Sequence, residues 1–227
     1  MLKNLIKIFF PNVCSGCSEM LLTNEDTICI SCRHKMPLTN DLLTTENESF
    51  KKFYGRIPIE HTSAMLYYHK KGIVQQLIHN LKYKNHQKVG LVLGEWYANN
   101  LNDIEILKNI DYIIPVPLHK KRLKERGYNQ VTTFGSAIAI GLKKQFNDTI
   151  LIRKQYAITQ SKKDLINRNS VSQNTFQAEF SSIHHNKHFL LIDDVLTTGA
   201  TLEACGKAIL QIPGAKLSIV TIAMSQS

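Results

Sequence analysis

The stretch LLIDDVLTTGAT, residues 190–201, constrains the fold of this chain more than any other. Its first residues are apolar, as in a buried β-strand, and the apolar residues of 202–209 recur at helical spacing. Two adjacent acids, Asp193 and Asp194, and a turn of small residues lie between these segments. The pattern predicts a strand, a turn and a helix within an α/β fold that has a mainly parallel sheet.

The turn has the chemistry of a phosphate site. Its threonines offer hydroxyls, and Gly199 lets an anion approach the backbone at a helix N-terminus, where free N–H groups and the helix dipole favour negative charge. The spacing matches neither a P-loop nor a dinucleotide-binding loop, which removes the usual support for nucleoside triphosphates and nicotinamide cofactors. Two acids can also simply cap a helix, but a cap needs only one. We therefore expect a phosphate-bearing ligand beside two carboxylates.

Two acids followed by Thr-Thr-Gly-Ala-Thr resemble the signature of the type I phosphoribosyltransferases, which bind phosphoribosyl pyrophosphate. The resemblance implies that Asp193 and Asp194 are catalytic and lie along the ribose hydroxyls, with Mg²⁺ bound alongside the diphosphate. It also implies that the turn holds the 5-phosphate. The turn residues are Val195, Leu196, Thr197, Thr198, Gly199, Ala200 and Thr201.

A basic run, HKKRLKERGYNQ at residues 119–130, follows a short apolar strand predicted at 111–118. Open α/β sheets bind ligands beyond the carboxyl ends of their strands, so the run is expected near the turn. Arg122 and Arg126 can grip a diphosphate through forked hydrogen bonds, although a solvated basic loop is the alternative. Gly127 permits a sharp turn, and Asn129 is expected to cap the next helix. The further ligand-binding residues expected in this run are Gly127, Asn129 and Gln130.

Two pairs of cysteines, CSGC and CISC, lie near the start of the chain. Each Cys-x-x-Cys turn presents two thiolates, and two such turns complete a tetrahedral four-sulfur zinc site with no open position. A pair of disulfides is the alternative, which the missing secretory signal disfavours. The expected structural zinc ligands are Cys14, Cys17, Cys29 and Cys32.

The Pro-Val-Pro of residues 115–117, Arg122 and the Arg-Gly-Tyr-Asn-Gln of residues 126–130 are similar to the signature of the ComF competence family, including its GntX-like members. That family joins a four-cysteine zinc knuckle to a phosphoribosyltransferase domain, and the resemblance covers essentially the whole chain. In its pattern a lid loop carries a Gln and a catalytic Arg, matched here by Gln160 and Arg168. The Asn that often follows three residues later is replaced by Val171.

The ComF resemblance implies a role in natural competence, in which the protein handles incoming single-stranded DNA together with a helicase-like partner. The chain has 28 Lys and Arg against 18 Asp and Glu and a formal net charge of +10, which suits a polyphosphate or nucleic acid, although solubility alone would also explain it. The alternative function is a phosphoribosyltransferase of nucleobase salvage with no DNA role. The sequence leaves the acceptor open, and also whether transfer occurs.

We expect three parts: an N-terminal helix and zinc knuckle at 1–40, a connector and hood-like helical cover at 41–110, and a phosphoribosyltransferase-like domain at 111–227. No C-terminal segment is expected to cover the acceptor, so the cover must precede residue 111. Residues 155–174 are predicted to form a lid that excludes water, or else an ordinary linker. No apolar run approaches the roughly 18 residues of a membrane span, so we expect a cytoplasmic protein.

Overall fold

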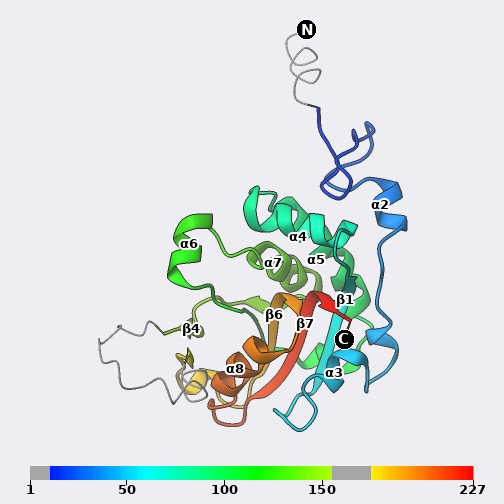
Figure 1. The fold of residues 1–227 in the computed structure, drawn as a ribbon. Coiled ribbons are helices and arrows are strands. Elements are labelled where there is room, and N and C mark those ends of the chain that lie inside the picture. The colour runs from blue at the N-terminus through cyan, green and yellow to red at the C-terminus, as the bar shows by residue number, and fades with distance from the viewer. Residues whose placement is uncertain (1–10, 155–174, 227) are drawn as a thin grey trace, which may run out of the picture.

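The computed structural model describes residues 11–154 and 175–226, and its centre is a five-stranded parallel sheet (Figure 1). The strand order is β1-β7-β6-β2-β3. The strands are β1 (His61–Tyr68), β2 (Tyr112–Pro115), β3 (Gln145–Phe146), β6 (His188–Leu196) and β7 (Lys216–Ser225). A separate antiparallel pair is formed by β4 (Leu151–Arg153) and β5 (Phe176–Ala178). The predicted α/β class with a mainly parallel sheet is confirmed.

Helices cover both faces of the sheet (Figure 1). One face carries α4 (Ile73–Tyr83), α5 (Lys88–Leu101) and α7 (Thr132–Leu142), and the other carries α8 (Ala200–Ile209) with the β4–β5 pair. The basic run forms α6 (Lys120–Arg126). The short helices are α2 (Ile30–His34) and α3 (Glu48–Lys51), with 3-10 turns at Asp41–Leu43, Glu105–Asn109 and Ser182–His184.

The central strand β6 is apolar on both sides because both of its faces are covered. Leu190 and Ile192 pack into the core shared with α4, α5 and α7, whereas Phe189 and Leu191 pack into the core shared with α8. Successive side chains of a strand point to opposite faces. The adjacent acids at the carboxyl end of β6 are therefore directed to different sides of the sheet.

The segment expected as connector and cover contributes more than a cover. β1 comes from this segment and pairs along its length with β7, so the sheet uses residues on both sides of position 110. The polar stretch before β1 contains α3 and the fully buried Phe53. A helix of one turn is too short to show an apolar period, which explains why the sequence indicated no element there.

Residues 1–10 and 155–174, which include the predicted N-terminal helix and the predicted lid, lie outside the described residues. Among the helices of the described ranges, none has the length and apolar character needed to cross a membrane.

Candidate ligand-binding site and four-cysteine cluster

The predicted strand, turn and helix are all present at the end of β6. The strand ends at Leu196, and α8 begins at Ala200 after Gly199, which has a φ of +77°. This left-handed conformation favours glycine. Gly199, at the N-cap of α8, has no side chain to cap the helix, and Thr198 Oγ1 accepts the N–H of Ala200 at 3.4 Å. Both Thr197 and Thr198 are exposed. The turn thus offers hydroxyls and helix N-terminal N–H groups, which is an arrangement suited to a phosphate.

Arg56 binds the backbone of this turn, and it lies in a segment where the sequence predicted no site residue. Its Nη1 donates hydrogen bonds to the carbonyl oxygens of Thr198 at 2.8 Å and of Lys52 at 2.6 Å. Its guanidinium also forms a salt bridge with Glu203, in the first turn of α8. A contact between residues 142 positions apart leaves no signal in local patterns, so only the structure identifies Arg56.

Asp194 has two side-chain partners, both on the same carboxylate oxygen. Its Oδ2 accepts a hydrogen bond from Gln130 Nε2 at 2.7 Å and forms a salt bridge with Lys82 Nζ at 2.8 Å. Arg126 Nη1 in turn donates to Gln130 Oε1 at 2.8 Å. The structure therefore joins three predicted residues from two separate motifs, and adds Lys82 from the last turn of α4.

Asp193 lies in a different environment on the α8 side of β6. Its Oδ1 accepts the backbone N–H of Asp194 at 2.8 Å. Burial of the carboxyl and the negative charge of Asp194 raise the pKa of Asp193, and they outweigh the hydrogen bond and the more distant Lys82, which lower it. A carboxyl with a raised pKa at the end of a central strand is a frequent feature of ligand sites.

Helix α6 presents most of the basic run to solvent. His119 caps its N-terminus by accepting a hydrogen bond from the backbone N–H of Lys121, and Gly127 ends it with a φ of +77°. The prediction that Asn129 caps the next helix is wrong, because α7 has Val131 at its N-cap and no side-chain cap. Asn129 Oδ1 accepts the N–H of Val131 at 3.4 Å, just ahead of the helix, and Asn129 Nδ2 donates to the carbonyl oxygen of Val116 at 2.9 Å, which fixes the loop that follows β2.

A cavity of about 430 Å³ lies between α6 and the loop after α4, and we call it the α6 cavity. The Arg126 guanidinium lies over the ring of Tyr83, 5.0 Å from its centroid. The lining residues are Lys82, Tyr83, Lys84, Asn85, Arg122, Glu125, Arg126 and Tyr128. Four cations and one acid give this cavity a positive potential suited to an anion.

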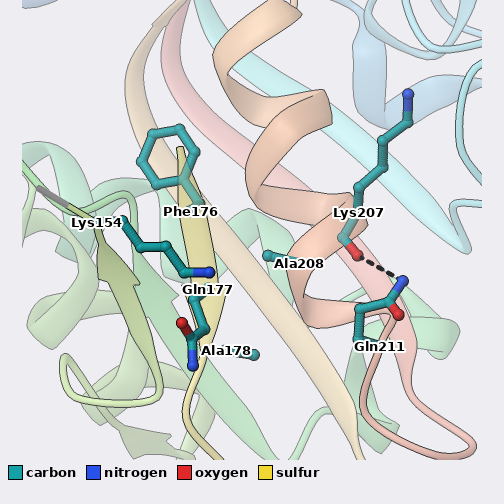
Figure 2. A pocket seen from close by; sticks show the side chains of 7 residues that line it. All are labelled: Lys154, Phe176, Gln177, Ala178, Lys207, Ala208 and Gln211. Carbon is teal, nitrogen blue, oxygen red and sulfur yellow. Dashed lines mark hydrogen bonds between the residues drawn. The ribbon is translucent and has the colours of Figure 1, made fainter. Parts of the chain in front are cut away.

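A second cavity, of about 510 Å³, lies on the opposite face between β5 and α8 (Figure 2). Figure 2 shows the Gln211 amide donating to the backbone carbonyl of Lys207, at 3.4 Å. Lys207 also forms a salt bridge with Glu203 at 2.6 Å. The lining residues are Lys154, Phe176, Gln177, Ala178, Lys207, Ala208 and Gln211, and none of them was predicted as a site residue.

The four predicted zinc ligands cluster as expected, with their sulfur atoms all within 4.8 Å of one another. All four are free thiols, and Cys17 Sγ lies 3.8 Å from Cys29 Sγ, so the disulfide alternative is not realised. Burial raises the pKa of Cys14, but backbone N–H groups, chiefly those of Cys29 and Gly16, lower it to about 7 overall. His34, at the end of α2, is not part of the cluster.

The cysteine cluster is attached to α4. Asn80 Nδ2, which is buried, donates to the carbonyl oxygen of Ser15 at 2.8 Å. A Cβ built on Gly16 would lie 2.9 Å from the side chain of Ile73, so this part of the knuckle approaches α4 closely. The cluster also belongs to the same hydrophobic core as α4, α5 and α7.

These features define an α/β protein with a mainly parallel sheet and an N-terminal four-cysteine cluster. The chain is similar to the DNA utilization protein YhgH of Shigella flexneri, with 24% identity over 91% of this chain and 88% of the relative. It is 32% identical to competence protein F of Haemophilus influenzae over 44% of each chain. The predicted resemblance to competence proteins is therefore confirmed. No protein-family model matches the chain.

Phosphoribosyltransferases also appear among the similar proteins. The adenine phosphoribosyltransferase of Haemophilus ducreyi is 25% identical over 57% of this chain and 72% of the relative. The crystal structure of the adenine phosphoribosyltransferase of Leishmania tarentolae aligns with 63% of this chain and 73% of its own, with 15% identity and a TM-score of 0.38. Gln160 and Arg168, predicted for the lid, lie outside the described residues.

The raised pKa of Asp193 predicts a stability that depends on pH. Between about pH 4 and pH 8 the folded state holds a proton that the unfolded state releases, so ionisation of Asp193 destabilises the folded protein as the pH rises. Asp193→Asn should therefore gain free energy of unfolding relative to the wild type, by on the order of 1 kcal/mol for each pH unit between pH 5 and pH 8. Urea unfolding at four pH values measures the difference.

Asp111→Asn is the matched control, because hydrogen bonds from His188 and Lys187 outweigh burial and lower the pKa of Asp111. Asp111→Asn should lower the free energy of unfolding by an amount that stays constant from pH 5 to pH 8. If the Asp193→Asn difference were equally constant, the raised pKa of Asp193 would be refuted.

Proposed function

We propose that this protein binds phosphoribosyl pyrophosphate at the turn after β6 and acts in DNA uptake during natural competence. The proposal rests mainly on the end of β6, where two carboxylates lie side by side in the sequence. The turn that follows leads through Gly199 to the N-terminus of α8, where the N-cap residue has no side chain. The relative named competence protein F supports the role in competence, and the relative named adenine phosphoribosyltransferase supports the proposed ligand.

In the proposed complex the 5-phosphate binds at residues 195–201 and the ribose hydroxyls face Asp193 and Asp194. The diphosphate lies toward α6, where Arg122 and Arg126 line a positive cavity. Mg²⁺ prefers oxygen ligands, which the two carboxylates and the ligand itself supply, and it would offset the charge of the diphosphate. Gln160 and Arg168 stay predicted partners of the diphosphate, as does a helicase-like partner of the protein.

Transfer of the ribosyl group would break the bond from C1 to the diphosphate as an acceptor nitrogen attacks C1. Positive charge develops on the ring in such a step, and the nearby carboxylates would stabilise it by electrostatics and positioning. The alternative function is therefore a salvage phosphoribosyltransferase without a DNA role, which the adenine phosphoribosyltransferase relatives favour. A screen for pyrophosphate release with candidate bases separates transfer from binding alone.

Calorimetric titration tests the ligand site. The wild type should bind phosphoribosyl pyrophosphate in the presence of Mg²⁺, and the variant carrying Asp193→Asn and Asp194→Asn should lose at least about tenfold in affinity because the carboxylates no longer meet the ribose and the metal. Asp111→Asn, which removes a carboxylate at the amino end of the sheet, should bind as the wild type does. Equal binding by the double variant would refute the assignment of the site.

We also propose that the cysteine cluster holds a structural zinc ion. Four thiols at this spacing fit the ion, and three of the four are buried, which leaves no position for a substrate. The purified protein should contain one zinc per chain, and chelation should lower the temperature of unfolding because metal binding and folding are coupled. Cys32→Ser should lose the zinc, whereas Cys205→Ala, a buried thiol on α8, should keep it. Full zinc content in Cys32→Ser would contradict the proposal.

A specific observation favours direct binding of single-stranded DNA. Helix α6 carries five cations against one acid, and no salt bridge to these cations is found among the described residues. Phosphate contacts of this kind give affinity that is independent of sequence and falls with salt. The cations are Lys120, Lys121, Arg122, Lys124 and Arg126.

Changing four of these cations should weaken DNA binding. A variant with Gln at 120, 121, 122 and 124 should bind a labelled oligo-dT about tenfold more weakly at low salt, measured by fluorescence anisotropy. The control removes the same charge elsewhere, with Gln at 108, 143, 144 and 187, and should bind nearly as the wild type does. Direct DNA binding would be excluded if the wild type bound no oligonucleotide at low salt.

A further inference from the structure

Asp194 and the α6 cavity share one side chain, that of Lys82. Lys82 Nζ is paired with Asp194 Oδ2 at 2.8 Å, and Lys82 is also one of the residues that line the cavity. Asp194 is not among the lining residues. The ammonium group therefore lies between a nearly buried carboxylate and a solvent-accessible space that holds three other cations.

The pair between Lys82 and Asp194 is not explained by stability alone. The side chain of Asp194 is 8% exposed and that of Lys82 is 22% exposed, so both charges have lost much of their hydration. The attraction within a pair of this kind often does no more than offset the cost of desolvation. Gln130 already donates a hydrogen bond to the same carboxylate oxygen, so Asp194 keeps a partner when Lys82 leaves.

The other cations of the cavity explain why Lys82 rests on Asp194 in the free protein. Lys84, Arg122 and Arg126 line the same space, and Glu125 is the one acid among its lining residues. Repulsion between like charges pushes the Lys82 ammonium toward Asp194. An anion in the cavity would reverse this balance, because it attracts all four cations at once.

We propose that Lys82 is an anion-binding residue whose ammonium group exchanges the carboxylate of Asp194 for an anion bound in the α6 cavity. Identification of that anion as the diphosphate of phosphoribosyl pyrophosphate rests on the proposed function. The exchange links the two ends of the ligand site, because the arrival of the diphosphate releases one oxygen of Asp194 from its salt bridge. The cavity binds its anion with reduced affinity as long as Asp194 holds Lys82.

Pyrophosphate alone is the probe that tests this exchange, by calorimetry at constant ionic strength. Asp194→Asn releases Lys82 and should raise the affinity for pyrophosphate about fivefold. Lys82→Met should lower the affinity, and Lys82→Arg should restore part of it. In the Lys82→Met background the gain from Asp194→Asn should disappear, since there is no ammonium group left to release. A gain in affinity cannot result from a damaged fold.

Glu125→Gln provides the matched control, because Glu125 lines the cavity and its removal raises the local potential without releasing Lys82. Its gain in pyrophosphate affinity should be the same with Lys82 or Met at position 82. The exchange is refuted if Asp194→Asn gains nothing, if its gain persists in Lys82→Met, or if the wild type binds no pyrophosphate. Ribose 5-phosphate serves as a separate probe, and its failure to bind the wild type would count against the proposed function alone.

Discussion

The carboxylate of Asp194 is the point on which the arrangement of the site depends. A nearly buried charge must find partners, because desolvation without compensation costs several kcal/mol. Asp194 finds them in Lys82 at the end of α4 and in Gln130 ahead of α7, and Gln130 is held in turn by Arg126 of α6. Oδ2 of Asp194 thus connects β6, directly or through Gln130, with residues of α4, of α6 and of the loop before α7.

The two faces of β6 explain why adjacent acids have different surroundings. Burial of both faces makes the strand continuously apolar, as is typical of parallel sheets, and the alternation of side chains then separates Asp193 from Asp194. Asp194 pairs with Lys82, whereas burial and the negative charge of its neighbour raise the pKa of Asp193. A repeated residue type thus gives two chemically distinct groups within one site.

Local patterns predicted the elements of this site well because each is continuous in the sequence. The strand, turn and helix around residues 190–209 and the clustering of the cysteines followed from spacing alone. Contacts between distant segments were not predictable in this way. Arg56 reaches the turn from a segment with no recognisable motif, and the basic character of residues 82–84 did not indicate that Lys82 pairs with Asp194. Asn129 was misassigned by a small shift in position: its Oδ1 accepts the N–H of Val131, the N-cap residue of α7, at 3.4 Å rather than an N–H within the helix.

Helix α4 connects the cysteine cluster to the proposed ligand site around Asp194. Asn80, in its last turns, holds the backbone of Ser15 between the first two cysteines, and Lys82, two residues later, holds Asp194. A helix is stiff over so short a distance, because its hydrogen bonds fix every backbone angle. Ordering of the knuckle around the proposed zinc ion would therefore stabilise the turn of α4 that carries Lys82. The cluster lies outside the proposed ligand site, yet it packs on the helix that supplies Lys82 to that site.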